Sequence, residues 1–159
     1  MTVELRVVDG GHADVAFALN SYFAELDARF PHGFDPGDAV ATAATDLSLP
    51  NGLCVLAYDG DEIAGCGGLS FLDSATAEIK RMWVAPRFRG QGVARQLLRR
   101  LEDEAALKAR NRVVLDTNGT LVDAIALYES SGYVSIDRYN DNPYAERWFA
   151  KEIAPRPGS

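Results

Sequence analysis

Gly90 and Gly92 stand one residue apart, between a strand-like apolar run and a segment of helical periodicity. The apolar run ends at Val84-Ala85-Pro86, and the helical segment follows Gly92 directly. Glycines at such a junction let backbone N–H groups approach an anion closely, and the helix adds the positive end of its dipole. Arg87 and Arg89 lie beside the glycines and carry guanidinium groups that can bind phosphate. This segment therefore predicts a site for a phosphate-bearing ligand.

Charge is unevenly distributed along a chain whose formal net charge is −7. The stretch from Lys80 to Arg100 holds seven of the 16 basic residues and none of the 23 acidic ones. A largely acidic protein repels nucleic acid, whose binding requires many phosphate contacts. One basic segment in an acidic body instead favours a small polyanionic ligand. The acidic remainder fits either a cationic second substrate or an ordinary solvated surface.

The chain of 159 residues is long enough for one domain, predicted over residues 3–153, with a disordered tail over residues 154–159. It has no apolar run long enough to span a bilayer and no leader-like pattern in its first ten residues, so a cytoplasmic location is expected. Cys54 and Cys66 are too few for a disulfide framework and are expected to be small buried thiols. His12 and His32 have no ligand cluster beside them, so no metal site is expected.

Hydrophobic periodicity and turn residues predict an α+β fold with a mixed, mostly antiparallel sheet. Strands are expected over residues 3–8, 53–58, 62–71, 76–84, 112–117, 133–136 and 147–153. Helices are expected over residues 15–26 and 38–47, from Gly92 to about Arg110, and from Leu121 to the helix-ending Gly132.

Two common phosphate-binding motifs do not fit the glycine segment. A P-loop requires a lysine and a hydroxyl residue after its last glycine, and this chain has neither there. A dinucleotide-binding fingerprint requires a third small residue, where this chain has the bulky Arg95.

The remaining pattern, Arg87-x-x-Gly90-x-Gly92, occurs here together with two further stretches. Upstream lies Ala77-Glu78-Ile79-Lys80-Arg81-Met82-Trp83-Val84-Ala85-Pro86, and downstream lies Ala124-Ile125-Ala126-Leu127-Tyr128-Glu129-Ser130-Ser131-Gly132-Tyr133. In this combination the chain resembles the GCN5-related N-acetyltransferase (GNAT) superfamily over residues 3–153. The resemblance implies a layered α/β/α fold of about seven strands and about four helices, whose fourth and fifth strands splay apart in a V.

The resemblance also implies acetyl-CoA as the co-substrate, bound within that V. The backbones of Met82, Trp83 and Val84 would meet its pantetheine and thioester and supply the oxyanion donor. The pyrophosphate would lie on backbone amides of the glycine segment, which comprises Arg87, Arg89, Gly90, Gln91, Gly92, Val93 and Ala94. An asparagine that is frequent in the family is replaced here by Leu121, and Asn118 just upstream is a candidate substitute.

Acyl transfer from a thioester requires a deprotonated amine, a donor for the oxyanion and a proton for the leaving thiolate. By resemblance, Tyr128 is the candidate general acid, although its spacing with Leu121 and Ile125 equally fits a buried helix face. Glu78 is the candidate general base, directly or through a water, unless it forms a structural ion pair or is simply exposed. Glu25 is a lesser alternative for the base.

The predicted function is transfer of an acetyl group to a primary amine of a small molecule or peptide, by direct attack in a ternary complex. The alternative is a non-catalytic acyl-CoA-binding or sensor domain of the same fold. No nucleic-acid or membrane partner is expected, and a homodimer stays possible. Several residues could line an acceptor pocket or belong to the core: Tyr22, Phe23, Phe30, His32, Phe34, Tyr139, Asn140 and Tyr144.

Overall fold

The computed structural model describes residues 2–156 and is built around one seven-stranded sheet. Its strands are β1 (Glu4–Val8), β2 (Gly52–Asp59), β3 (Glu62–Phe71), β4 (Thr76–Val84), β5 (Arg112–Thr117), β6 (Val134–Ser135) and β7 (Arg147–Glu152). Its helices are α1 (Ala13–Arg29), α2 (Ala39–Asp46), the short 3-10 helix Pro86–Phe88, α3 (Val93–Leu107) and α4 (Val122–Ser130). The strand order is β1-β2-β3-β4-β5-β7-β6, and among these pairs β4 with β5 is parallel and the others are antiparallel.

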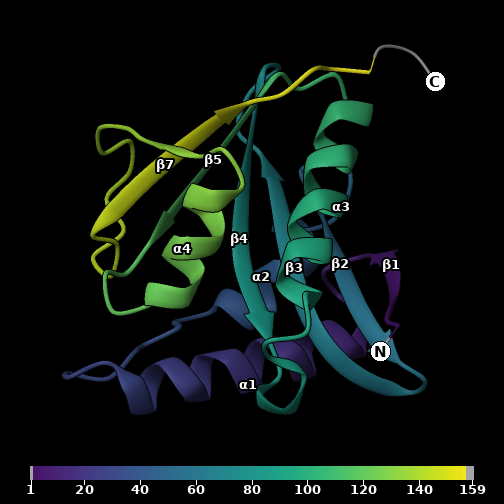
Figure 1. Ribbon diagram of the computed structural model, residues 1–159. Helices are drawn as coiled ribbons and strands as arrows, with labels where there is room; N and C mark the ends of the chain where they lie inside the picture. The colour runs from purple at the N-terminus through teal and green to yellow at the C-terminus, as the bar shows by residue number, and fades with distance from the viewer. Residues whose placement is uncertain (1, 157–159) are drawn as a thin grey trace.

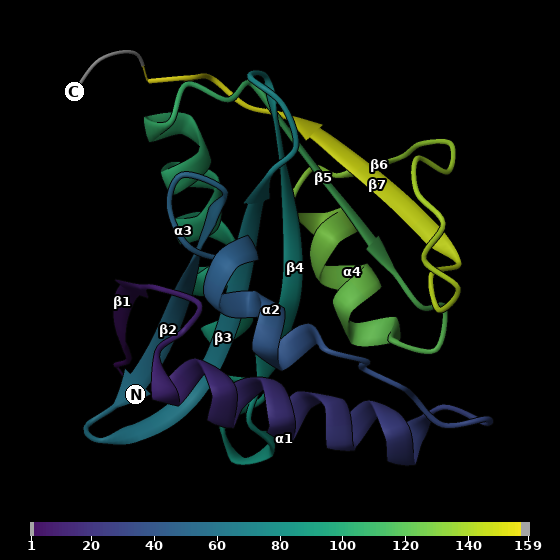
Figure 2. The same cartoon turned by 180° about the vertical axis from the view of Figure 1, so that it is seen from behind.

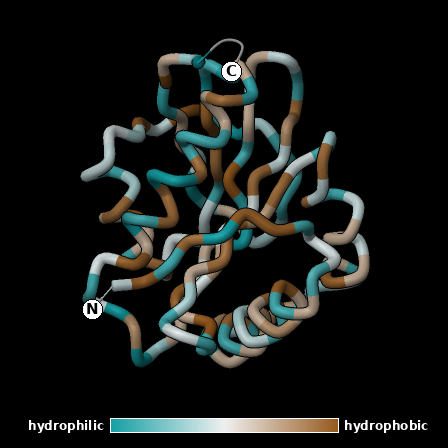
Figure 3. The backbone as a smooth tube through the Cα atoms, turned by 90° about the vertical axis from the view of Figure 1, so that its right-hand side faces the viewer, coloured by the Kyte–Doolittle hydropathy of each residue, from teal (hydrophilic) through white to brown (hydrophobic). Residues whose placement is uncertain are grey.

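Helices cover both faces of the sheet. Helices α3 and α4 lie on one face (Figure 1), and α1 and α2 lie on the other (Figure 2). Strand β2 supplies both cores, because Val55 belongs to the cluster under α3 and Leu56 belongs to the cluster under α1. Hydrophobic stretches run through the middle of the chain trace, while many turns at its surface are hydrophilic (Figure 3). The layered α/β/α architecture predicted from the sequence is confirmed.

Helix α1 forms because its apolar residues recur at helical spacing and its start is capped. The Nδ1 atom of His12 accepts a hydrogen bond from the backbone N–H of Asp14 at 3.0 Å. Val15, Leu19 and Phe23 are buried on the face that covers the sheet. This histidine therefore has a local structural role.

Helix α3 is also amphipathic, with Leu97, Leu98 and Leu101 fully buried against the sheet. It ends at Leu107 rather than near Arg110, because Ala109 adopts a left-handed conformation with φ of 62° and turns the chain. For the site, the important feature of α3 is that its N-terminus directly follows Gly92.

Strands β4 and β5 pair only at their first residues. Their pairing runs from Thr76 opposite Arg112 to Glu78 opposite Val114, after which the strands separate in a V (Figure 1). The predicted splay is thus confirmed. From Ile79 onward, the edge of β4 that faces β5 has no strand beside it, so its backbone polar groups remain available to a ligand.

A β-bulge interrupts β4 just beyond this point. The register with β3 shifts between Cys66 and Gly68, and Arg81 lies in the bulge with φ of 58°. Left-handed backbone is unfavourable for a residue with a Cβ atom, so this conformation is strained. The local sequence does not predict the bulge, because position 81 is an arginine and neither a glycine nor a proline.

Other features differ in detail from the sequence expectation. Strand β6 is only two residues long, and a 3-10 helix begins at Pro86 where no element was expected. Of the predicted tail, residues 154–156 are placed, with the Arg156 N–H donating to the Ala106 carbonyl at 2.8 Å, and residues 157–159 lie outside the described residues. Cys54 and Cys66 are free, buried thiols. Within residues 2–156, no helix has the length and apolar character needed to cross a membrane.

Candidate active site

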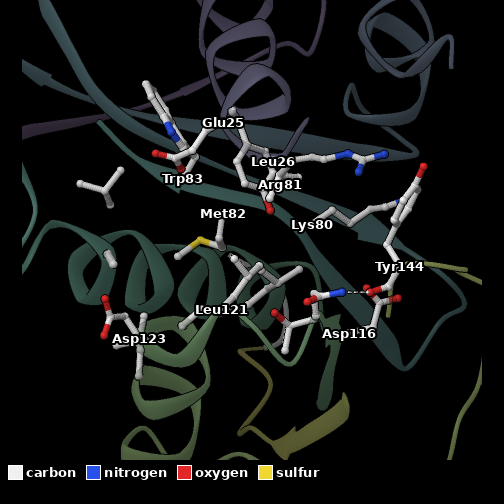
Figure 4. Close-up of a pocket in the computed structure, with 18 of the residues that line it drawn as sticks. Glu25, Leu26, Lys80, Arg81, Met82, Trp83, Asp116, Leu121, Asp123 and Tyr144 are labelled. Atoms are coloured by element: carbon white, nitrogen blue, oxygen red, sulfur yellow. Dashed lines mark hydrogen bonds between the residues drawn. The ribbon is translucent and has the colours of Figure 1, made fainter. Parts of the chain in front are cut away.

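A cleft of about 900 Å³ opens where β4 and β5 separate (Figure 4). Its walls come from β4, the glycine segment with the start of α3, α4, the C-terminal half of α1, and the loops that follow β5 and β6. Glu78 and Tyr128 both line it. One cavity therefore contains the predicted phosphate site and both predicted catalytic side chains.

The glycine segment has the conformation that an anion cradle requires. Gly90 and Gly92 have φ of 75° and 84°, which favours glycine. A Cβ atom at either position would meet no protein atom within 4 Å, so the space in front of the segment is open. The first turn of α3 has no side-chain cap, and its N–H groups remain available to a bound anion.

Most of the predicted cofactor residues line the cleft, but two do not. Those on the cleft are Met82, Trp83, Val84, Arg89, Gly90, Gly92, Val93, Ala94 and Asn118. The side chain of Arg87 instead makes two hydrogen bonds of 2.7 Å to Glu62, and the Gln91 amide donates to the Arg87 carbonyl. Neither residue is part of the cleft wall.

Arg89 lies at the cleft, but its guanidinium group is already occupied. Its Nη2 atom lies 2.5 and 2.8 Å from the two carboxylate oxygens of Glu25, and its Nε donates to the Val84 carbonyl at 3.0 Å. Arg89 therefore ties α1 to the end of β4. In this arrangement, the backbone N–H groups and the start of α3 are the parts of the glycine segment that remain available to an anion.

Tyr128 is buried in α4 with its ring against Tyr133 and Phe149. Its hydroxyl group makes no hydrogen bond to any residue from 2 to 156, although the side chain borders the cleft. Burial raises the pKa of Tyr128 well above the ordinary tyrosine value, with nearby Tyr22 and Asp116 acting in the same direction. The hydroxyl group is therefore protonated at neutral pH, as that of an ordinary tyrosine also is.

Glu78 is a charged residue in an almost fully buried position, with 6% of its surface exposed. Its Oε2 atom accepts a hydrogen bond of 2.5 Å from the Tyr139 hydroxyl, and its Oε1 atom lies 3.7 Å from the Lys80 ammonium. These partners orient the carboxylate at the point where β4 leaves β5. Glu25, the alternative base, is instead held by Arg89.

Asp116 is a cleft residue that the sequence argument missed. Its carboxylate accepts hydrogen bonds from the side-chain amides of Asn140 and Asn142, at 2.5 and 3.1 Å. Trp148 donates to Asn140 at 3.0 Å, so the loop before β7 is fastened across the end of β5. A carboxylate after three apolar residues of a buried strand was the available signal. Asn118 fastens the same loop by donating to the Tyr144 carbonyl at 2.7 Å.

Aromatic side chains line one end of the cleft. Tyr22, Phe30, Phe34 and Tyr144 line it, whereas Phe23 and His32 do not. The rings of Phe34 and Tyr144 lie 4.6 Å apart, centroid to centroid. This end therefore offers an apolar surface next to the polar groups of β4.

A metal centre has no support in the part of the chain that the structure describes. Residues 2–156 contain no group of three or more histidine, cysteine, aspartate or glutamate side chains that could hold a metal ion.

Comparisons with known proteins agree with this geometry. The model of the acetyltransferase (GNAT) family matches residues 19–133. The chain is 36% identical to the uncharacterized N-acetyltransferase YjgM of Escherichia coli (strain K12) over 129 residues, which cover 76% of this chain and 77% of that protein. It is 37% identical over 87 residues to the uncharacterized N-acetyltransferase YsnE of Bacillus subtilis (strain 168), covering 54% of this chain and only 58% of that relative.

A solved structure has the same fold. The GNAT family acetyltransferase from Elizabethkingia anophelis with acetyl-CoA bound superposes with a TM-score of 0.69, at 22% identity, over 95% of this chain and 98% of that one. The fold, the open glycine segment and the match over residues 19–133 all lead to one assignment. The chain belongs to the acetyltransferase (GNAT) family.

Proposed function

We propose that this protein transfers an acetyl group from acetyl-CoA to a primary amine of a small molecule or peptide, by direct attack within a ternary complex. The observation that carries the proposal is the single cleft that holds the glycine segment, Tyr128 and Glu78. The open space before Gly90 and Gly92 fits a pyrophosphate, and the unpaired edge of β4 fits an extended pantetheine chain. That the neighbour from Elizabethkingia anophelis has acetyl-CoA bound supports the choice of donor.

Each catalytic residue has one proton to move in this proposal. Glu78 takes a proton from the acceptor's ammonium group, directly or through a water. The amine nitrogen then attacks the thioester carbonyl carbon, and a backbone N–H near Met82–Val84 stabilises the oxyanion. When the C–S bond breaks, Tyr128 gives its proton to the sulfur, and the nitrogen releases its second proton to water. Tyr128 is then reprotonated from solvent, and Glu78 returns its proton to solvent. The products are the acetylated amine and free CoA.

The test measures free thiol released from acetyl-CoA with a broad panel of primary amines, alongside acetyl-CoA binding by calorimetry. Thiol release that depends on the amine, with the acetylated amine identified by mass spectrometry, is the expected result. Binding of acetyl-CoA without release across the panel would instead favour a non-catalytic acyl-CoA-binding domain.

A further inference from the structure

Arg81 carries a cleft-lining positive charge that no carboxylate of residues 2–156 neutralises. Its guanidinium group is half-buried and lies over the ring of Phe23, with the Cζ atom 5.2 Å from the ring centroid. By contrast, Lys80, Arg87 and Arg89 in the same segment each have an acidic partner. A partly desolvated guanidinium group without an anion is costly, which suggests that a ligand supplies the anion.

The bulge explains why this charge points into the cleft. In a regular strand, successive side chains alternate between the two faces of the sheet. Here Ile79 and Met82 join the core on the α3 side, whereas Lys80 and Arg81 between them do not, and Arg81 packs against Phe23 of α1. All four residues border the cleft. The left-handed backbone at Arg81 thus places a second cation on the face that already holds Lys80. Figure 4 shows both side chains on the same side of the pocket as Tyr144.

The acidic groups around this position are already engaged. Glu78 accepts from Tyr139, Asp116 accepts from two asparagine amides, and Glu25 pairs with Arg89. Arg29, which also lines the cleft, donates to the Thr120 carbonyl and makes no ion pair with a described residue. Arg81 and Arg29 are thus cations of the cleft wall that make no ion pair with a described residue.

We infer that the acceptor carries a carboxylate near its amine, and that Arg81 binds this carboxylate while the amine faces Glu78. This inference rests on the proposed function and names its substrate class: amino acids and related amino carboxylates. A guanidinium group can hold a carboxylate through two parallel hydrogen bonds and so fix the orientation of the amine. A polyamine fits less well, because its second ammonium group would face Arg81 and Arg29.

The test compares L-amino acids with their carboxamides, in which an uncharged amide of similar shape replaces the carboxylate. Both kcat/KM with acetyl-CoA and binding to the CoA-loaded protein are measured for the native chain and for Arg81→Gln. In the native chain, we expect the carboxylate form to be preferred. In Arg81→Gln, this preference falls by about tenfold, equivalent to about 1.4 kcal/mol. Because each variant serves as its own reference, intrinsic differences between the two amines cancel. Arg99→Gln removes an exposed charge of α3 outside the cleft and keeps the native ratio.

The two proposals fail in different ways. Turnover of amines with the same carboxylate-to-carboxamide ratio in the native chain and Arg81→Gln would overturn this inference and leave the proposed function standing. Carboxylate-selective binding that depends on Arg81, without turnover, would support the ligand class and overturn the proposed function. The absence of both turnover and carboxylate-dependent binding would overturn both.

Discussion

At the scale of single residues, Tyr128 offers the clearest test of the chemistry. Its side chain borders the cleft, and its hydroxyl group is protonated at neutral pH and has no hydrogen-bond partner among the described residues. Since a positioned general acid contributes about 10²-fold or more, Tyr128→Phe should lower kcat by about 10²-fold. Calorimetry should show unchanged acetyl-CoA affinity, because the ring and its packing are kept.

Tyr58→Phe is the matched control for this substitution. Tyr58 is also buried, but its hydroxyl group donates to Asp14 at 2.6 Å and does not line the cleft. Its replacement should affect stability and leave kcat close to the native value. If Tyr128→Phe behaves like Tyr58→Phe, Tyr128 has no part in the proton transfer.

Glu78→Gln tests the proposed base, because the substitution removes the carboxylate and keeps nearly the same side-chain shape. The amide cannot take a proton from the acceptor, so kcat/KM at neutral pH should fall by about 10²-fold. Glu25→Gln, which breaks the ion pair with Arg89, should change the rate much less. A native rate for Glu78→Gln would exclude Glu78 as the base, and a larger loss for Glu25→Gln would favour Glu25.

The residue scale also marks the limit of what this sequence can predict. The positions of Glu78 and Tyr128 followed from their motifs, and the structure brings both to one cleft. The partners of Arg87 and Arg89 did not follow, because Glu62 and Glu25 lie 25 and 64 residues away in the chain. Ion pairs at such separations depend on tertiary structure and cannot be read from the local sequence. The sequence therefore suggested that both guanidinium groups were available to bind phosphate, although each is held by a carboxylate.

At the scale of elements, the junction between β4 and α3 carries the next prediction. Gly92→Ala places a Cβ atom on a residue with φ of 84°, which should destabilise the fold by about 1–2 kcal/mol. It should also displace N–H groups at the start of α3 and weaken acetyl-CoA binding by about tenfold, since hydrogen bonds to charged groups contribute about 1.5–3 kcal/mol. Chemical denaturation and calorimetry measure the two effects separately.

Gly60→Ala separates backbone strain from loss of the anion site. Gly60 has φ of 61° in the β2–β3 hairpin, and a Cβ atom there also meets nothing within 4 Å. The two alanine variants should therefore lose similar stability, while only Gly92→Ala loses affinity. Equal affinities would mean that the glycine segment does not hold the pyrophosphate.

Elements with a clear hydrophobic periodicity could be predicted from the sequence, and irregular elements could not. Leu97, Leu98 and Leu101 identified α3 because their spacing matches a helix packed on a sheet. The bulge at Arg81 and the loop that carries Tyr139 and Asn140 have no comparable period. The loop is held by hydrogen bonds from Tyr139 to Glu78 and from Asn140 to Asp116. At the bulge, the Cys66 thiol of the neighbouring strand donates to the Arg81 carbonyl.

At the scale of the whole molecule, titratable groups buried in the core under α1 predict how stability depends on pH. Burial raises the pKa of Cys54 from 9.0 to about 12 and that of Tyr22 from 10.0 to about 12. Both groups are neutral below their ordinary pKa values, so their contribution to stability is complete below about pH 9. Above that pH the unfolded chain loses protons that the folded chain keeps, and the free energy of unfolding must fall.

Cys54 alone should lower the free energy of unfolding by about 1.4 kcal/mol for each pH unit between about 9 and 12. Thermal unfolding at constant ionic strength should give a steady Tm from pH 7 to about 8.5 and a progressive decline above pH 9. Cys54→Ala removes one titrating thiol, so it should start from a lower Tm because of the cavity but decline less steeply. Parallel curves for the two proteins would show that the Cys54 thiol titrates alike in the folded and unfolded chains.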